Sequence, residues 1–114
     1  MNALLMRKPR IERIVELGLL INEIVEYEGK IPRKPIQQLR KLKRQFKAAI
    51  GDELLSEIIK TDLLVITEVE QYIIAHNRGD TVGAKRHQNE SERLWEETDE
   101  LIYQVIDEVN ANGN

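Results

Sequence analysis

Four polar residues lie on faces of predicted helices that should be buried, and they are the first candidates for chemistry. They are Asp62, His76, His87 and Thr98. A carboxylate and two imidazoles can bind a metal or carry a proton, so one hypothesis is a small enzyme or metal-binding bundle around Asp62, His76 and His87. Neither Glu-x-x-His nor His-Glu-x-x-His occurs in the sequence, which argues against a di-iron or zinc site. We predict four buried polar residues, with no catalytic residue, no metal ligand and no cofactor.

The spacing of these residues predicts which of them meet. They lie on two predicted helices, at residues 52–76 and 84–109, and a loop at residues 77–83 joins these helices. If the two helices form a hairpin, residues equidistant from the loop lie at the same level. This register places Asp62 opposite Thr98, and His76 near His87.

Asp62 interrupts the apolar stripe of the third predicted helix. A buried carboxylate needs hydrogen bonds or a cation, because desolvating it alone costs several kcal/mol. We expect its partner to be Thr98, a helix cap, or an arginine of another helix such as Arg13 or Arg10. The alternative function is a buried acid that fixes register or lines a small pocket.

The strongest surface signal is a basic stretch between Gly29 and Gly51, which contains no acid. Its eight cations are Lys30, Arg33, Lys34, Arg40, Lys41, Lys43, Arg44 and Lys47. Cations of this kind bind nucleic-acid phosphates with salt-sensitive affinity, and they suit an acidic protein equally well. The one aromatic residue of this stretch, Phe46, is on its apolar side, which argues against a stacking platform for single strands.

The net charge of −3 hides a division between the halves of the chain. Residues 1–50 hold 12 Lys and Arg against 5 Asp and Glu, whereas residues 51–114 hold 5 against 15. Such asymmetry indicates either an oppositely charged partner or attraction between the two halves. We favour the second interpretation, because helical bundles often place basic and acidic helices side by side.

The outward face of the fourth predicted helix carries eight of the 15 acids in residues 51–114. They include Glu90, Glu92, Glu96, Glu97, Asp99, Glu100, Asp107 and Glu108. The spacing of Glu96, Glu97 and Glu100 resembles the first half of the magnesium-binding motif of all-α nucleoside triphosphate pyrophosphohydrolases. The second half, Glu-x-x-Asp, is missing, because Ala111 follows Glu108 where the aspartate belongs. We therefore interpret this face as a solvated acidic surface.

The first predicted helix, from Pro9 to the cap at Gly29, is apolar over far more than one stripe. A domain this small has no layer that buries a helix on every side, so we predict a homo-oligomer. The expected interface residues are Leu17, Gly18, Leu20, Ile21 and Ile24. The alternative is that Leu19 and Leu20 are simply exposed.

Length and composition predict the architecture. The 114 residues suit one domain, residues 1–114, and four amphipathic patterns with short connections predict an all-α, antiparallel four-helix bundle. The second helix is expected at residues 36–50. Asp52 is expected to cap the third helix, unless Thr61 or Asp62 begins a second segment. Residues 1–8 and 110–114 are expected to fray.

The absence of cysteine excludes disulfide and thiol chemistry and is compatible with a cytoplasmic location. The apolar run from Ala3 to Met6 is too short for a signal peptide, and we expect no membrane association. Together these patterns predict a non-enzymatic protein-interaction, assembly or regulatory bundle that acts as a homo-oligomer and binds another protein. The main alternative is a nucleic-acid-binding accessory protein that uses residues 30–47.

Overall fold

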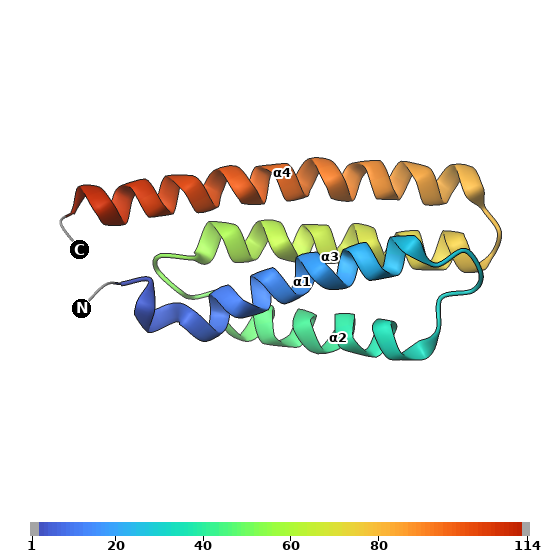
Figure 1. Ribbon diagram of the computed structural model, residues 1–114, viewed down its shortest axis with the longest axis horizontal. Coiled ribbons are helices and arrows are strands. Elements are labelled where there is room, and N and C mark those ends of the chain that lie inside the picture. The colour runs from blue at the N-terminus through green and yellow to red at the C-terminus, as the bar shows by residue number, and fades with distance from the viewer. Residues whose placement is uncertain (1–2, 113–114) are drawn as a thin grey trace.

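The computed structural model describes residues 3–112, and this part of the chain is helical with short connections (Figure 1). A 3₁₀ turn precedes four α-helices: η1 (Leu5–Arg7), α1 (Lys8–Glu26), α2 (Arg33–Ala48), α3 (Ser56–Asn77) and α4 (Thr81–Ala111). The prediction of an all-α fold with four helices is confirmed. The expected fraying of the termini includes residues 1–2 and 113–114, which lie outside the described residues.

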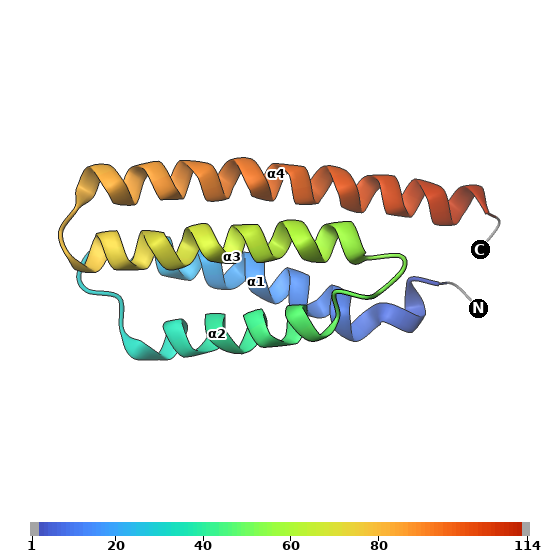
Figure 2. The same ribbon diagram turned by 180° about the vertical axis from the view of Figure 1, so that it is seen from behind.

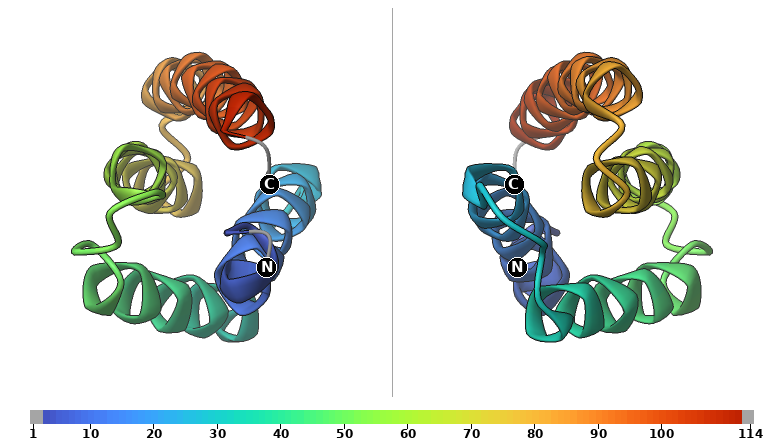
Figure 3. Two further views of the ribbon diagram at one scale, coloured as in Figure 1. Left: turned by 90° about the vertical axis from the view of Figure 1, so that its left-hand side faces the viewer. Right: turned by 90° about the vertical axis from the view of Figure 1, so that its right-hand side faces the viewer.

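The helices form an elongated molecule of 51 × 23 × 21 Å, and successive helices run in opposite directions along its length (Figure 1). Helix α3 packs against both α4 and α2, so it lies between them when the molecule is seen from behind (Figure 2). The views along the axis place α2 and α4 on opposite sides of the bundle (Figure 3). The basic and acidic helices are therefore separated, and the expectation that they lie side by side is wrong.

Two helices start near their expected first residues, for reasons visible in the sequence. Pro9 occupies the first turn of α1, where its missing amide hydrogen costs no hydrogen bond. Helix α2 follows the extended residue Pro32 and buries Pro35 in its own first turn. Helix α1 ends at Glu26, before the expected cap at Gly29.

The two helices of the C-terminal half differ from expectation at their starts. Helix α3 begins at Ser56, because the side chain of Asp52 binds backbone amides in the turn before it. It then continues unbroken, so neither of the two alternative caps starts a second segment. Helix α4 begins at Thr81, where Asp80 accepts a hydrogen bond of 2.9 Å from the amide of Gly83.

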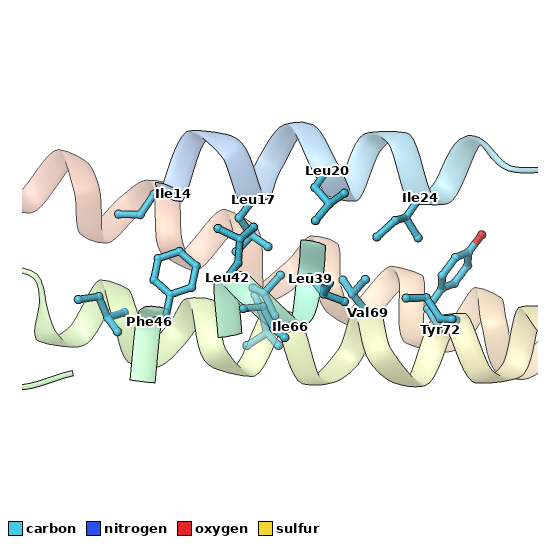
Figure 4. Close-up of a cluster of buried hydrophobic side chains, with 14 of the residues drawn as sticks. Ile14, Leu17, Leu20, Ile24, Leu39, Leu42, Phe46, Ile66, Val69 and Tyr72 are labelled. Carbon is cyan, nitrogen blue, oxygen red and sulfur yellow. The ribbon is translucent and has the colours of Figure 1, made fainter. Parts of the chain in front are cut away.

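The core forms where the apolar side of α1 meets α2 and α3 (Figure 4). Leu17, Leu20 and Ile24 are 0%, 5% and 0% exposed within the single chain. These side chains have no surface to offer a second molecule, so their assignment to an oligomer interface is corrected. The physical reason is that α1 faces more than one helix of its own chain, and this buries a wide arc of its surface.

The remaining predicted interface residues lie toward α4. A β-carbon built on Gly18 would come within 2.9 Å of the Trp95 ring, so this glycine allows close approach of α4 rather than of a second chain. Ile21 lines the groove beside that contact and is half-buried. Leu19 is 67% exposed, which matches the alternative interpretation for this residue, whereas Leu20 is buried. Self-association itself stays a prediction.

Candidate functional site

The predicted pair of Asp62 and Thr98 is present at the centre of the contact between α3 and α4. Both side chains are completely buried, and Thr98 Oγ1 donates a hydrogen bond of 3.1 Å to Asp62 Oδ1. Among the described residues, Asp62 Oδ2 is buried without a hydrogen-bond partner. Of the expected alternatives, the bond to Thr98 is therefore present. No ion pair joins Asp62 to Arg13 or Arg10 among the described residues, and Arg10 pairs with Asp52 instead.

The environment of Asp62 disfavours its charged form. Burial raises the pKa of Asp62 to about 7, although the hydrogen bond from Thr98 lowers it and nearby Asp99 raises it further. A carboxyl group with this pKa exchanges its proton near neutral pH. This carboxyl group lies between two packed helices, α3 and α4.

A second buried aspartate, Asp52, was expected only as a helix cap. Its carboxylate accepts hydrogen bonds from the amides of Leu54 and Leu55 at 2.9 and 3.0 Å, and from Arg7 Nε at 2.8 Å. Arg10 adds a further ion pair. The two arginines precede Asp52 by 42 and 45 residues, so no local sequence signal could have identified them.

The electrostatics of Asp52 are opposite to those of Asp62. Burial by itself raises the pKa of Asp52, but the hydrogen bond from the Leu55 amide and those from Arg7, Arg10 and the Leu54 amide outweigh it and lower the pKa to about 2. This ionised group joins the start of α1 to the connection between α2 and α3.

The two histidines, which were expected near one another, contact different partners. His76 Nε2 lies 2.8 Å from the carbonyl oxygen of Gly29, and its ring stacks on Tyr72. His87 Nδ1 lies 2.7 Å from a carboxylate oxygen of Glu68. Both histidines are half-buried rather than fully buried. Each ties one helix to a neighbouring segment.

These positions do not support the metal hypothesis around Asp62, His76 and His87. Within residues 3–112, no group of three or more His, Cys, Asp or Glu side chains is arranged to hold a metal ion. The same range contains no helix with enough uninterrupted apolar length to cross a bilayer.

The cations of the predicted basic stretch lie on α2, apart from Lys30 in the connection before it, and we call this set the basic face of α2. It comprises Lys30, Arg33, Lys34, Arg40, Lys41, Lys43, Arg44 and Lys47. Every member is exposed except Lys43, which is half-buried and forms a 3.0 Å ion pair with Glu70 of α3. The opposite side of α2 carries Leu39, Leu42 and Phe46 into the core. The basic face is therefore held rigidly at the surface by a packed helix.

The outer side of α4 forms an acidic surface on the far side of the bundle (Figure 3). A shallow groove along it is lined by Glu96, Asp99, Glu100, Tyr103, Gln104 and Asp107. Nearer the start of α4, Arg93 forms ion pairs with Glu90 and Glu97 and neutralises part of the charge there. The strongest uncompensated acidity thus lies between Glu96 and Asp107.

A second groove lies between α1 and α4, with a volume of about 340 Å³. Gly18, Ile21 and Asn22 line it from α1, and Ser91 and Trp95 are among its residues on α4. The hydroxyl of Ser91 already donates to the carbonyl oxygen of Gln88 in its own helix, at 2.7 Å.

Comparison of the chain with protein families, with curated proteins and with solved structures finds no match. The structure brings Asp62 together with Thr98, gives His76 and His87 different partners, and leaves seven of the eight basic-face cations exposed. Chemically, the two charged faces can bind oppositely charged partners, and the buried polar residues hold helices together.

Proposed function

We propose that this protein is a non-enzymatic binding protein that engages an acidic protein surface through the basic face of α2. The observation that carries the proposal is a set of eight cations, seven on α2 and Lys30 in the connection before it, with no acid among them and on the side of the bundle away from α4. Because α4 cannot reach these cations within one molecule, their charge is available to a partner. Such a surface accelerates encounter and selects oppositely charged partners more than it supplies affinity.

The polar residues that first suggested chemistry support this proposal by having structural partners. Thr98 binds Asp62, Gly29 binds His76 and Glu68 binds His87. Each contact joins two segments of the fold, so these side chains are engaged in maintaining the scaffold that presents α2.

A protein partner fits the surface better than a nucleic acid does. The outer side of α2 carries no aromatic side chain on which a base could stack. Its 16 residues extend over roughly 24 Å, which matches one acidic helix or strand laid along it. The basic face nevertheless suits phosphate contacts, so nucleic-acid binding is the second candidate.

The test is a calorimetric titration of the full chain with two polyanions, poly-L-glutamate and a short DNA duplex. The variant combines Arg40→Glu, Lys41→Glu, Arg44→Glu and Lys47→Glu, all at exposed positions. We expect it to lose at least about tenfold in affinity for poly-L-glutamate, and we expect wild-type affinity to fall steeply with salt.

The matched control makes the same charge change away from α2, with Lys8→Glu, Lys60→Glu, Lys85→Glu and Arg86→Glu at exposed positions. It should bind within about threefold of wild type, because only long-range charge has changed. Equal binding by wild type and the α2 variant would overturn the proposal. A wild type that binds the duplex but not poly-L-glutamate near physiological salt would put the nucleic-acid candidate first.

A further inference from the structure

The acidic side of α4 has a stripe of residues directly opposite its buried side. Glu96, Glu100, Tyr103 and Asp107 follow the spacing i, i+4, i+7, i+11, which keeps them on one helical face opposite Thr98. Tyr103 is 69% exposed in the middle of these acids. An exposed aromatic ring between carboxylates is a surface that recognises cations, because the ring face attracts a guanidinium or ammonium group. We call these four residues the α4 stripe.

The basic face of α2 presents the same spacing. Arg33, Gln37, Arg40 and Arg44 occupy i, i+4, i+7 and i+11 on the side opposite Leu42. Both stripes therefore extend over roughly 17 Å of helix, with one uncharged polar residue in each. Two helices laid along one another can bring these charges into register, since the spacing of side chains along both faces is equal.

One molecule cannot make this contact with itself. Helix α3 packs against both α2 and α4, which lie on opposite sides of the bundle in the axial views (Figure 3). The charged side chains of both helices are at exposed positions, away from this packing. We infer that the acidic surface bound by the basic face of α2 is the α4 stripe of a second copy of this chain. This inference rests on the proposed function and names the partner.

The geometry determines the kind of assembly. The two contact surfaces are different and lie on opposite sides of each copy, so the contact is head-to-tail. After one α2–α4 contact forms, each end of the pair still has a free surface of the opposite kind. The assembly therefore continues to grow with concentration instead of stopping at a dimer.

The charged side chains at the α2–α4 contact determine how strongly the copies associate. Exposed ion pairs each contribute little, and a contact along one helix face is small, so association is weak and sensitive to salt. Arginines over Tyr103 add a contact that salt screens less than it screens the carboxylates.

The experiment measures the mass of the full chain by light scattering from about 10 µM to about 1 mM, at low salt and at about 0.5 M salt. We expect the average mass of wild type at low salt to rise to at least about twice that of the monomer and to return to the monomer value at high salt. The α2 variant described above should stay monomeric, while its control at Lys8, Lys60, Lys85 and Arg86 should assemble.

A second variant reverses the acidic side, with Glu96→Lys, Asp99→Lys, Glu100→Lys and Asp107→Lys. It too should be monomeric by itself, and an equimolar mixture with the α2 variant should restore the assembly, because opposite charges again face each other. Tyr103→Ala should reduce the association constant about threefold. Circular dichroism of each variant checks that the helices are intact.

The outcomes separate this inference from the proposed function. If wild type is monomeric under all conditions but still binds poly-L-glutamate through α2, the self-association is wrong and the proposed function stands. If the control variant loses assembly as fully as the α2 variant, net charge rather than the stripe controls association, and the inference is wrong. If wild type neither assembles nor binds poly-L-glutamate, both proposals fail.

Discussion

Asp52 and Asp62 are two buried carboxylates ten residues apart, and their surroundings give them opposite behaviour. Asp52 has four donors, from two backbone amides and two arginines, and its pKa is lowered to about 2. Asp62 has a single threonine hydroxyl, and burial raises its pKa to about 7. The difference shows that a buried acid stays charged when its hydrogen-bond donors and cations outweigh the desolvation that burial imposes.

The comparison also separates two structural roles. Asp52 connects segments that are distant in sequence. Its charge therefore stabilises the contact between the start of α1 and the connection from α2 to α3. Asp62 lies in the middle of the contact between α3 and α4, where its charge has no cation among the described residues. A stabilising charge and a destabilising one thus occur within one small domain.

Replacing Asp52 is expected to have the largest effect on stability. Asp52→Ala leaves two amides and two arginines without their acceptor, so the free energy of unfolding should fall by about 3 kcal/mol at pH 7. Both arginines keep access to water, which limits the loss. Urea unfolding followed by circular dichroism measures it.

The pH dependence of this effect has a defined sign. Since the pKa of Asp52 is about 2 when folded and 3.8 ordinarily, its contribution is present above pH 3.8 and is lost as pH falls through 2. The difference between wild type and Asp52→Ala should therefore shrink in acid. The control Asp107→Ala, at an exposed position, should change stability by less than about 0.5 kcal/mol. If Asp52→Ala lost no more stability than this control, the stabilising role of the ion pairs between Asp52 and the two arginines would be contradicted.

Removing the charge at Asp62 should raise the free energy of unfolding, whereas removing the charge at Asp52 should lower it. We expect Asp62→Leu to raise the free energy of unfolding by about 2 kcal/mol at pH 8, because it replaces an ionised interior carboxylate with a side chain of similar size. Thr98 can then donate to a carbonyl oxygen of its own helix.

The stability that Asp62→Leu gains over wild type should depend on pH. The pKa of Asp62 is about 7 when folded, above its ordinary value of 3.8, so the stability that its protonated form provides is complete below pH 3.8 and is lost as pH rises through 7. Unfolding experiments at pH 5 and pH 8 should show the advantage of Asp62→Leu mainly at pH 8. A strongly destabilised variant at pH 8 would mean that the carboxylate has a cationic partner after all.

The smallest effect is expected at the donor to Asp62. Thr98→Val keeps the shape of the side chain but removes the hydrogen bond, so it should lower stability by about 1 kcal/mol at pH 8. The same change made in the Asp62→Leu background should cost less than about 0.5 kcal/mol, because the hydrogen bond no longer exists there. Equal costs in both backgrounds would show that Thr98 contributes by packing alone.

The sequence predicted the register at Asp62 because it depends on local rules. The helical period identifies the inward face of each helix, and the short loop aligns residues on either side of it. The same argument placed His76 near His87, but it did not identify the groups that the two side chains contact. Near the end of a bundle, side chains can turn toward connections and solvent, and these two rings bind Gly29 and Glu68 instead.

Long-range partners were beyond the reach of the sequence. Nothing near Asp52 indicates that Arg7 and Arg10 reach it across more than forty residues. The wide apolar surface of α1 was correctly identified, but its assignment to a second chain was wrong for Leu17 and Ile24. Periodicity shows how much of a helix is buried and leaves open which chain buries it.

The contact between Gly18 and Trp95 has a practical consequence for optical spectroscopy. Trp95 is the only tryptophan in the chain, and its ring lies against the backbone of α1. Its emission therefore reports on one seam of the molecule, the one between the first and last helices. Helix α4 packs mainly on α3, so the contact with α1 is the smaller of the two. The protein thus contains an intrinsic fluorophore that monitors the contact between its first and last helices.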